Sequence, residues 1–206
     1  MDTEEYKGYK INISYDEDPM NPRTEWDNSG TMVCFHKRYD LGDKDHGYKF
    51  SDYDSFDEME NAIRKQEDVA IILPIYMYDH SGITINTTGF SCNWDSGQIG
   101  FIFISKAKAR EIWGWKVLTQ KRLSSIEGYL KNEIEVYDQF LTGQVYGFQV
   151  EKDGEELDGE ELDSCWGFFG DNHEKSGLMD HARNSIDCII SAELDKHGIQ
   201  TKLELA

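Results

Sequence analysis

The chain has 206 residues and a strongly acidic composition, with 40 Asp and Glu against 21 Lys and Arg and a formal net charge of −19. This charge repels nucleic acid and anionic membranes, so direct binding to either is not expected. The 10 Phe, 11 Tyr and 5 Trp residues exclude an acidic disordered protein. A basic partner protein or a cation is the natural complement, although acidity also serves solubility alone.

The organisation of the chain favours one domain over residues 1–206, because no linker rich in Pro, Ser or Gly separates the periodic segments. Residues 1–10 lack the apolar core of a signal peptide. No run approaches the about 20 apolar residues of a transmembrane helix, so we expect a cytoplasmic protein. The cysteines are widely spaced without a CxxC pair, which favours reduced thiols.

The first predicted elements are two strands separated by loops. Residues 9–15 alternate apolar and polar positions, which predicts a strand with one buried face. Residues 16–30 contain two of the three prolines and predict a loop or a sheet edge. Residues 31–38 predict a second strand and residues 39–54 an acidic, glycine-containing loop. A short helix then begins at Ser55, where the sequence has a capping box.

The segment 69–105 is the expected centre of the sheet. Three apolar or β-branched runs are separated by the turn-rich sequences DHSG and NWDSG, a pattern typical of an antiparallel meander. The two turns hold many reactive residue types, namely Asp79, His80, Ser81, Cys92, Trp94, Asp95 and Ser96.

The rest of the chain predicts helices on either side of a hairpin. Residues 106–112 predict a short helix, and residues 119–142 a long one, because apolar residues recur there at spacings of three and four. Residues 144–150 and 163–170 predict a hairpin joined by a very acidic loop.

The chain ends in a predicted helix over about residues 176–196, before Gly198, with a short strand or tail over 199–205. Clustered strands with interspersed helices indicate an α+β fold. We expect a mainly antiparallel sheet of about 5–7 strands with two long helices packed on one face.

A metal site or an enzyme active site is one alternative for the turns. Cys34 and His36 on one strand face, with His80 and Cys92, would form a Cys₂His₂ set suited to zinc, although buried cysteines and surface histidines explain the same residues. A cysteine beside a histidine, or the Asp79-His80-Ser81 run, would suit nucleophilic catalysis. No nucleophile elbow is present, and Asp and Ser in turns mostly serve backbone geometry. The alternative site comprises Cys34, His36, Asp79, His80, Cys92, Trp94 and Asp95.

Other ligand classes are less favoured. A calcium loop from Asp43 fails the EF-hand pattern because Tyr48 stands where glycine is required. Phosphate-binding glycine motifs are missing from the sequence, and the aromatic residues are interleaved with acids. A small-molecule or nucleotide binder remains possible, with Trp26, Trp94 and Trp166 lining a cleft. No cofactor is expected.

The charge itself suggests a function. Carboxylates spaced like backbone phosphates can occupy the basic groove of a nucleic-acid-binding protein. They then reproduce the electrostatic steering that the nucleic acid itself provides. The predicted partner-binding residues are Asp16, Glu17, Asp18, Asp40, Asp43, Asp45, Asp52, Asp54, Asp57, Glu58, Glu60, Glu151, Asp153, Glu155, Glu156, Asp158, Glu160 and Glu161.

Four sequence stretches carry a resemblance: DPMNPRTEWDNSGTMVCFHKRYDLGD, YDHSG, FSCNWDSGQIGFIFISK and CWGFFGD. Over about residues 11–171 the chain resembles a family of small acidic proteins carried by bacteriophages and mobile elements. Such cargo often includes anti-restriction and anti-CRISPR proteins, several of which mimic nucleic acid. The resemblance implies an inhibitor of a host nucleic-acid-binding defence protein and assigns no catalytic residue.

Overall fold

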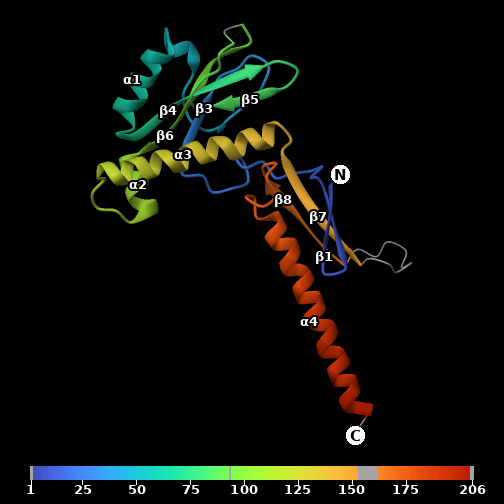
Figure 1. The fold of residues 1–206 in the computed structure, drawn as a ribbon. Helices are drawn as coiled ribbons and strands as arrows, with labels where there is room; N and C mark the ends of the chain where they lie inside the picture. The colour runs from blue at the N-terminus through green and yellow to red at the C-terminus, as the bar shows by residue number, and fades with distance from the viewer. Residues whose placement is uncertain (1, 93, 153–161, 205–206) are drawn as a thin grey trace. The chain divides into compact units, whose positions relative to one another are not determined.

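The computed structural model describes residues 2–92, 94–152 and 162–204, which contain four α-helices and eight strands (Figure 1). Every strand pair in these residues is antiparallel, which confirms the predicted α+β class. The strands form two four-stranded sheets where one larger sheet was expected. The chain divides into two compact units, Met1–Met20 with Gly143–Ala206 (unit 1) and Asn21–Thr142 (unit 2). The expectation of a single domain stays a prediction.

Unit 2 holds a sheet with the strand order β3-β6-β4-β5. Its elements are β3 (Thr31–Cys34), η1 (Phe50–Asp52), α1 (Phe56–Gln66), β4 (Val69–Asp79), β5 (Ile83–Asn86), β6 (Ser96–Ser105), α2 (Lys106–Trp113) and α3 (Gln120–Leu141). α3 packs on one face of this sheet through residues such as Leu130 and Ile134, and α1 packs on the other through Met59 and Ile63. The central strands are therefore buried on both faces, which explains their continuous apolar sequences.

The predicted meander over residues 69–105 is wrong in its strand order. β6 pairs with β4 and not with β5, so β4 lies between the two. β5 ends at Asn86 and β6 begins at Ser96, on the opposite edge of β4. Because Tyr78 pairs with Ser96, the turn after β4 and the turn before β6 lie at the same end of the sheet.

The helix cap predicted at Ser55 is present at the start of α1. The Ser55 hydroxyl accepts a hydrogen bond from the Glu58 N–H at 3.2 Å, and the Glu58 carboxylate accepts one from the Asp54 N–H at 2.7 Å. These two bonds satisfy free N–H groups at the start of α1. α3 begins after Thr119, and its predicted existence is confirmed.

Asp138 on α3 joins that helix to β5. Its Oδ1 accepts hydrogen bonds from the Ile85 N–H at 2.7 Å and the Thr84 hydroxyl at 2.8 Å. Burial raises the pKa of the Asp138 carboxyl above its ordinary value, against the opposing effect of these two bonds. In the folded state the carboxyl therefore holds its proton at a higher pH than in the unfolded chain.

Asp138→Asn is therefore expected to remove a pH dependence. The stability that the raised pKa provides is fully present below the unfolded value of about 3.9 and is lost as pH rises through the folded pKa. Relative to Asp138→Asn, the stability of the wild type should therefore fall as pH rises from acid to neutral. Urea denaturation of both proteins from acid to neutral pH measures this; a constant difference would contradict it.

Unit 1 holds the second sheet, with the strand order β1-β2-β7-β8. Its elements are β1 (Asp2–Tyr6), β2 (Tyr9–Tyr15), β7 (Val145–Lys152), β8 (Asp163–Phe169) and α4 (Leu178–Glu204). α4 packs on one face of this sheet, where Leu178 and Ile186 meet Ile11 and Phe148. The predicted hairpin of β7 and β8 is confirmed. The long helices α3 and α4 pack on the two different sheets.

Two elements of unit 1 differ from prediction. β1 pairs with β2 at the sheet edge, but its polar and mostly exposed residues give no strand pattern in the sequence. α4 continues through Gly198 to Glu204, so the predicted strand or tail after residue 198 is wrong. A glycine inside a helix costs only about 1 kcal/mol relative to alanine and need not end it. Among the described residues, no helix has the length and apolar character needed to cross a membrane.

Candidate functional site

An open pocket of about 730 Å³ lies in unit 2, at the sheet end where the two turns meet. Cys34 ends β3 and residues 35–41 follow it, Asp79 ends β4, and residues 94–99 include the first residues of β6. Because β3 and β4 both run antiparallel to β6, these three segments converge at one end of the sheet. Phe50 and Phe56 complete the wall. We call this cavity the turn pocket.

The turn pocket collects most of the predicted alternative site. Its lining includes Cys34, His36, Asp79, Trp94 and Asp95. The other two residues lie next to it: the His80 Nδ1 is 3.2 Å from the Asp95 Oδ2, and the Cys92 carbonyl accepts a hydrogen bond from the Ser96 hydroxyl. These residues therefore lie around one cavity, although the strand order that forms it differs from the one expected.

Asp79 is held by basic and aromatic neighbours. Arg38 forms an ion pair with Asp79, and the Tyr39 hydroxyl donates to its Oδ1 at 3.3 Å. The Arg38 guanidinium lies 5.4 Å from the centre of the Tyr39 ring, on which His36 also stacks at 5.1 Å. Both carboxylate oxygens of Asp79 are engaged, so this residue orders the pocket wall and is not a free base.

The His80–Asp95 pair lacks a nucleophile within the described residues. The His80 ring contacts the Asp95 carboxylate and stacks on Tyr78 at 5.9 Å, and no serine or cysteine of the described chain bonds to it. Both side chains are largely exposed, at 64% and 42%. The arrangement supplies two of the three parts of a catalytic triad, and the third is not in place.

Cys34 is half-buried and lines the turn pocket, and its environment disfavours the thiolate. Burial raises the pKa of Cys34 to about 12, although the nearby Arg23 guanidinium acts in the opposite direction. Since the thiolate is the reactive form, Cys34 is a poor nucleophile at neutral pH. In the described part of the chain, no group of three or more His, Cys, Asp or Glu side chains is placed to hold a metal ion, so the Cys₂His₂ set is not assembled.

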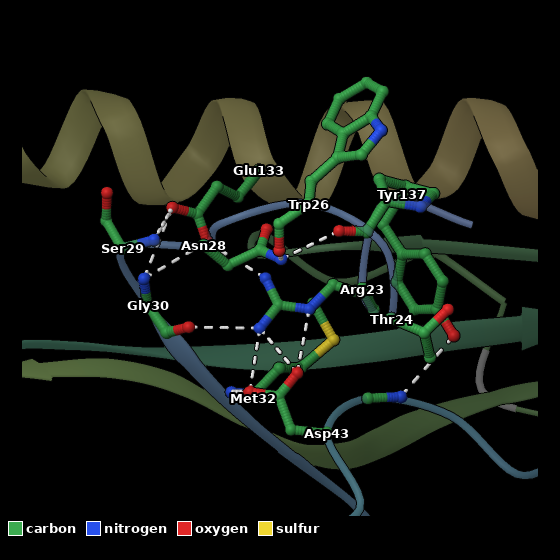
Figure 2. Close-up of polar contacts among 12 residues, drawn as sticks. Arg23, Thr24, Trp26, Asn28, Ser29, Gly30, Met32, Asp43, Glu133 and Tyr137 are labelled. Atoms are coloured by element: carbon green, nitrogen blue, oxygen red, sulfur yellow. Dashed lines mark hydrogen bonds and ion pairs between the residues drawn. The ribbon is translucent and has the colours of Figure 1, made fainter. Parts of the chain in front are cut away.

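Sequence reasoning missed the buried arginine that supports the turn pocket. The Arg23 side chain is only 1% exposed and bonds to both oxygens of Asp43, at 2.7 and 2.8 Å (Figure 2). It also donates to Glu133 of α3 at 3.0 Å and to the Gly30 carbonyl at 3.0 Å. Glu133 in turn accepts the N–H of Ser29 at 2.8 Å. The network links the loop of Arg23 and the loop of Asp43 to helix α3.

This network fixes the segment that follows β3 and forms one pocket wall. Asp43 also accepts the Met32 N–H at 2.9 Å, and the Gly42 N–H donates to the Tyr137 hydroxyl at 3.4 Å. Gly42 has φ +77, and a Cβ there would lie 2.8 Å from the Met32 carbonyl oxygen, so the turn requires glycine. The isolated Arg23 in a polar loop gives no signal in sequence that it is buried.

Exposed aromatic side chains flank the turn pocket. Trp94 is 96% exposed and Phe50 is 40% exposed, and both line the cavity. An indole left in water beside an open pocket is typical of a binding surface, because Trp is enriched among the residues that dominate binding energy. Trp26 lies in the loop of the Arg23 network, and Trp166 lines a pocket of unit 1.

Most of the predicted partner-binding carboxylates of unit 2 are exposed to solvent. Exposed members within residues 40–60, here called the acidic segment, are Asp40, Asp45, Asp52, Asp54, Asp57 and Glu58. Glu60 is half-buried and pairs with Arg64 at 2.7 Å. Asp43 serves the internal network and is not free for a partner. The acidic segment contributes Asp40, Phe50 and Phe56 to the turn pocket.

The remaining predicted carboxylates belong to unit 1 or are not described. Asp16, Glu17 and Asp18 follow β2, and Glu151 lies on β7. Asp153, Glu155, Glu156, Asp158, Glu160 and Glu161 lie outside the described residues.

Comparisons with models of protein families, with curated proteins and with solved structures find no match to this chain. The resemblance to phage-borne acidic proteins therefore stays a prediction.

Proposed function

We propose that this chain is a phage-type inhibitor that binds the basic, nucleic-acid-binding surface of a host defence protein, of the anti-restriction or anti-CRISPR kind. The observation that carries this proposal is the continuity of the acidic segment with the turn pocket in unit 2. Asp40 of that segment lines the cavity together with the exposed indole of Trp94. Five further exposed carboxylates lie in the same segment.

The two parts of this surface have different physical roles. Carboxylates on exposed loops attract a basic partner at long range and give a salt-dependent association rate, as phosphates do. The turn pocket takes a side chain of the partner after contact, since buried aromatic anchors supply most of the affinity of an interface. Within the described residues, Asp45, Asp52 and Asp57 enter no ion pair, so their charge is open to a partner.

A small molecule in the turn pocket is the second candidate. Its volume of about 730 Å³ lies within the range of about 300–1,000 Å³ typical of ligand sites, and its wall combines aromatic rings with charged groups. The incomplete His80–Asp95 pair and the raised Cys34 pKa favour binding over catalysis. A small-molecule site would show a ligand-dependent rise in melting temperature.

The partner proposal is tested by capture from nuclease-treated host lysate, followed by elution in a salt gradient. The variant D40N/D45N/D52N/D54N removes four exposed carboxylates of the acidic segment. The control D2N/E5Q/E111Q/E135Q removes four exposed carboxylates elsewhere and leaves the same net charge. We expect a basic nucleic-acid-binding protein to be retained by wild type and control, and to elute from the first variant at clearly lower salt.

Equal elution from both variants would contradict a role for the acidic segment. Capture of a partner that is neither basic nor able to bind nucleic acid would contradict the proposed class of target.

A further inference from the structure

The face of the unit 1 sheet opposite α4 carries an aromatic residue that lies across a glycine. Ile13 and Phe148 are buried against α4, so the neighbouring positions Ser14 and Gly147 point to the opposite face. Ser14 pairs with Gly147, and Gly147 pairs with Trp166 on β8. These three residues thus lie side by side across three strands.

Gly147 is what allows the Trp166 indole to lie on the sheet. A Cβ at Gly147 would stand 2.1 Å from Cε3 and 2.4 Å from Cδ2 of Trp166, so any other residue would displace the ring. The indole rests on the Gly147 backbone, yet Trp166 remains 43% exposed. Tyr15, the last residue of β2, is 62% exposed and stacks on Tyr146 at 4.9 Å.

These aromatic residues share a pocket of about 560 Å³ with an acidic turn; its lining is Ser14, Tyr15, Asp16, Glu17, Asp18 and Trp166. The turn is ordered, because the Asp16 N–H donates to the Val145 carbonyl at 2.8 Å and the Asp18 N–H donates to the Asp16 Oδ1 at 3.1 Å. The carboxylates of Glu17 and Asp18 are exposed and form no ion pair with any described residue. We call this cavity the Trp166 pocket.

We infer that the Trp166 pocket binds the guanidinium group of an arginine side chain on the basic partner. The inference rests on the proposed function and names the partner chemistry for unit 1. A planar guanidinium stacks on an aromatic face, and Trp is the strongest such partner. Glu17 and Asp18 complement its charge, whereas they repel a phosphate or a carboxylate ligand. An aromatic wall beside free carboxylates therefore selects a cation that is also flat.

The test uses a hexa-arginine peptide titrated into the full chain at low salt. Binding is followed by calorimetry and by the indole N–H resonance of Trp166, which is assigned by its loss in W166L. We expect the peptide to shift that resonance, and E17Q/D18N and W166L each to weaken binding about threefold or more. W166F, which keeps a ring, should retain part of the affinity, and hexa-lysine should bind more weakly because an ammonium does not stack.

Two outcomes separate this inference from the proposed function. If W166L and E17Q/D18N bind like wild type while D40N/D45N/D52N/D54N loses affinity, the Trp166 pocket is not the arginine site, and the acidic segment alone serves the partner. If hexa-arginine binds to none of these proteins, the preference for a basic partner is overturned as well. Thermal unfolding of each variant shows that the loss does not come from unfolding.

Discussion

Arg23→Met is expected to lower the free energy of unfolding by about 3–5 kcal/mol, because it leaves two carboxylates without their cation in a largely buried site. The Arg23 side chain is 1% exposed, and its partners Asp43 and Glu133 are 26% and 16% exposed. A loss of this size approaches the whole stability of many domains, about 5–15 kcal/mol. Chemical denaturation of unit 2 within the full chain measures it.

Two control variants distinguish the cost of leaving buried carboxylates unpaired from the cost of replacing an arginine side chain. Arg64 pairs with Glu60 on the exposed face of α1, and Arg64→Met should change stability by about 0.5 kcal/mol or less. The triple variant R23M/D43N/E133Q should recover part of the loss, because neutral amides still accept backbone hydrogen bonds and no unpaired charge remains. A loss below about 1 kcal/mol for Arg23→Met would show that the network is not a structural support.

Trp94→Ala is expected to weaken binding of the proposed basic partner by about 2 kcal/mol or more, roughly thirtyfold in Kd. Trp94 is 96% exposed in the free chain, so its truncation removes little packing within unit 2. The free energy of unfolding should therefore change by about 0.5 kcal/mol or less. Calorimetry with the captured partner gives the affinity, and denaturation gives the stability.

The matched control for Trp94 is Tyr129, an exposed aromatic residue of unit 2 that does not line the turn pocket. Tyr129→Ala should leave partner affinity within about twofold of wild type. If both variants bind the partner equally well, the turn pocket is not part of the interface.

Local sequence patterns predicted most of the elements, because alternation and helical spacing are properties of short segments. The Ser55 cap, the long helix α3 and the β7–β8 hairpin all follow from such patterns. β1 escaped prediction because its residues are polar and exposed at a sheet edge. The division into two sheets and the pairing of β6 with β4 depend on contacts between distant segments, which periodicity does not encode.

The candidate site was predicted in part. The reactive residues of the two turns meet because both turns lie at one end of β4. Cys34 and His36 join them because β3 ends at Cys34, beside β6, and His36 follows it. Arg23 was not predicted, since only the tertiary structure places its partners Asp43 and Glu133 around it. The internal role of Asp43 could not be predicted for the same reason. Nothing in the sequence distinguishes it from the exposed carboxylates of the same acidic run.

The most direct test of the proposed function is displacement of DNA from the captured partner. A labelled duplex is bound to the partner, and the chain is titrated in while fluorescence anisotropy reports the DNA. The proposal predicts a fall to the anisotropy of free DNA as the chain is added at a fixed salt concentration. DNA that stays bound while the chain joins it in a ternary complex would contradict occupation of the nucleic-acid-binding surface.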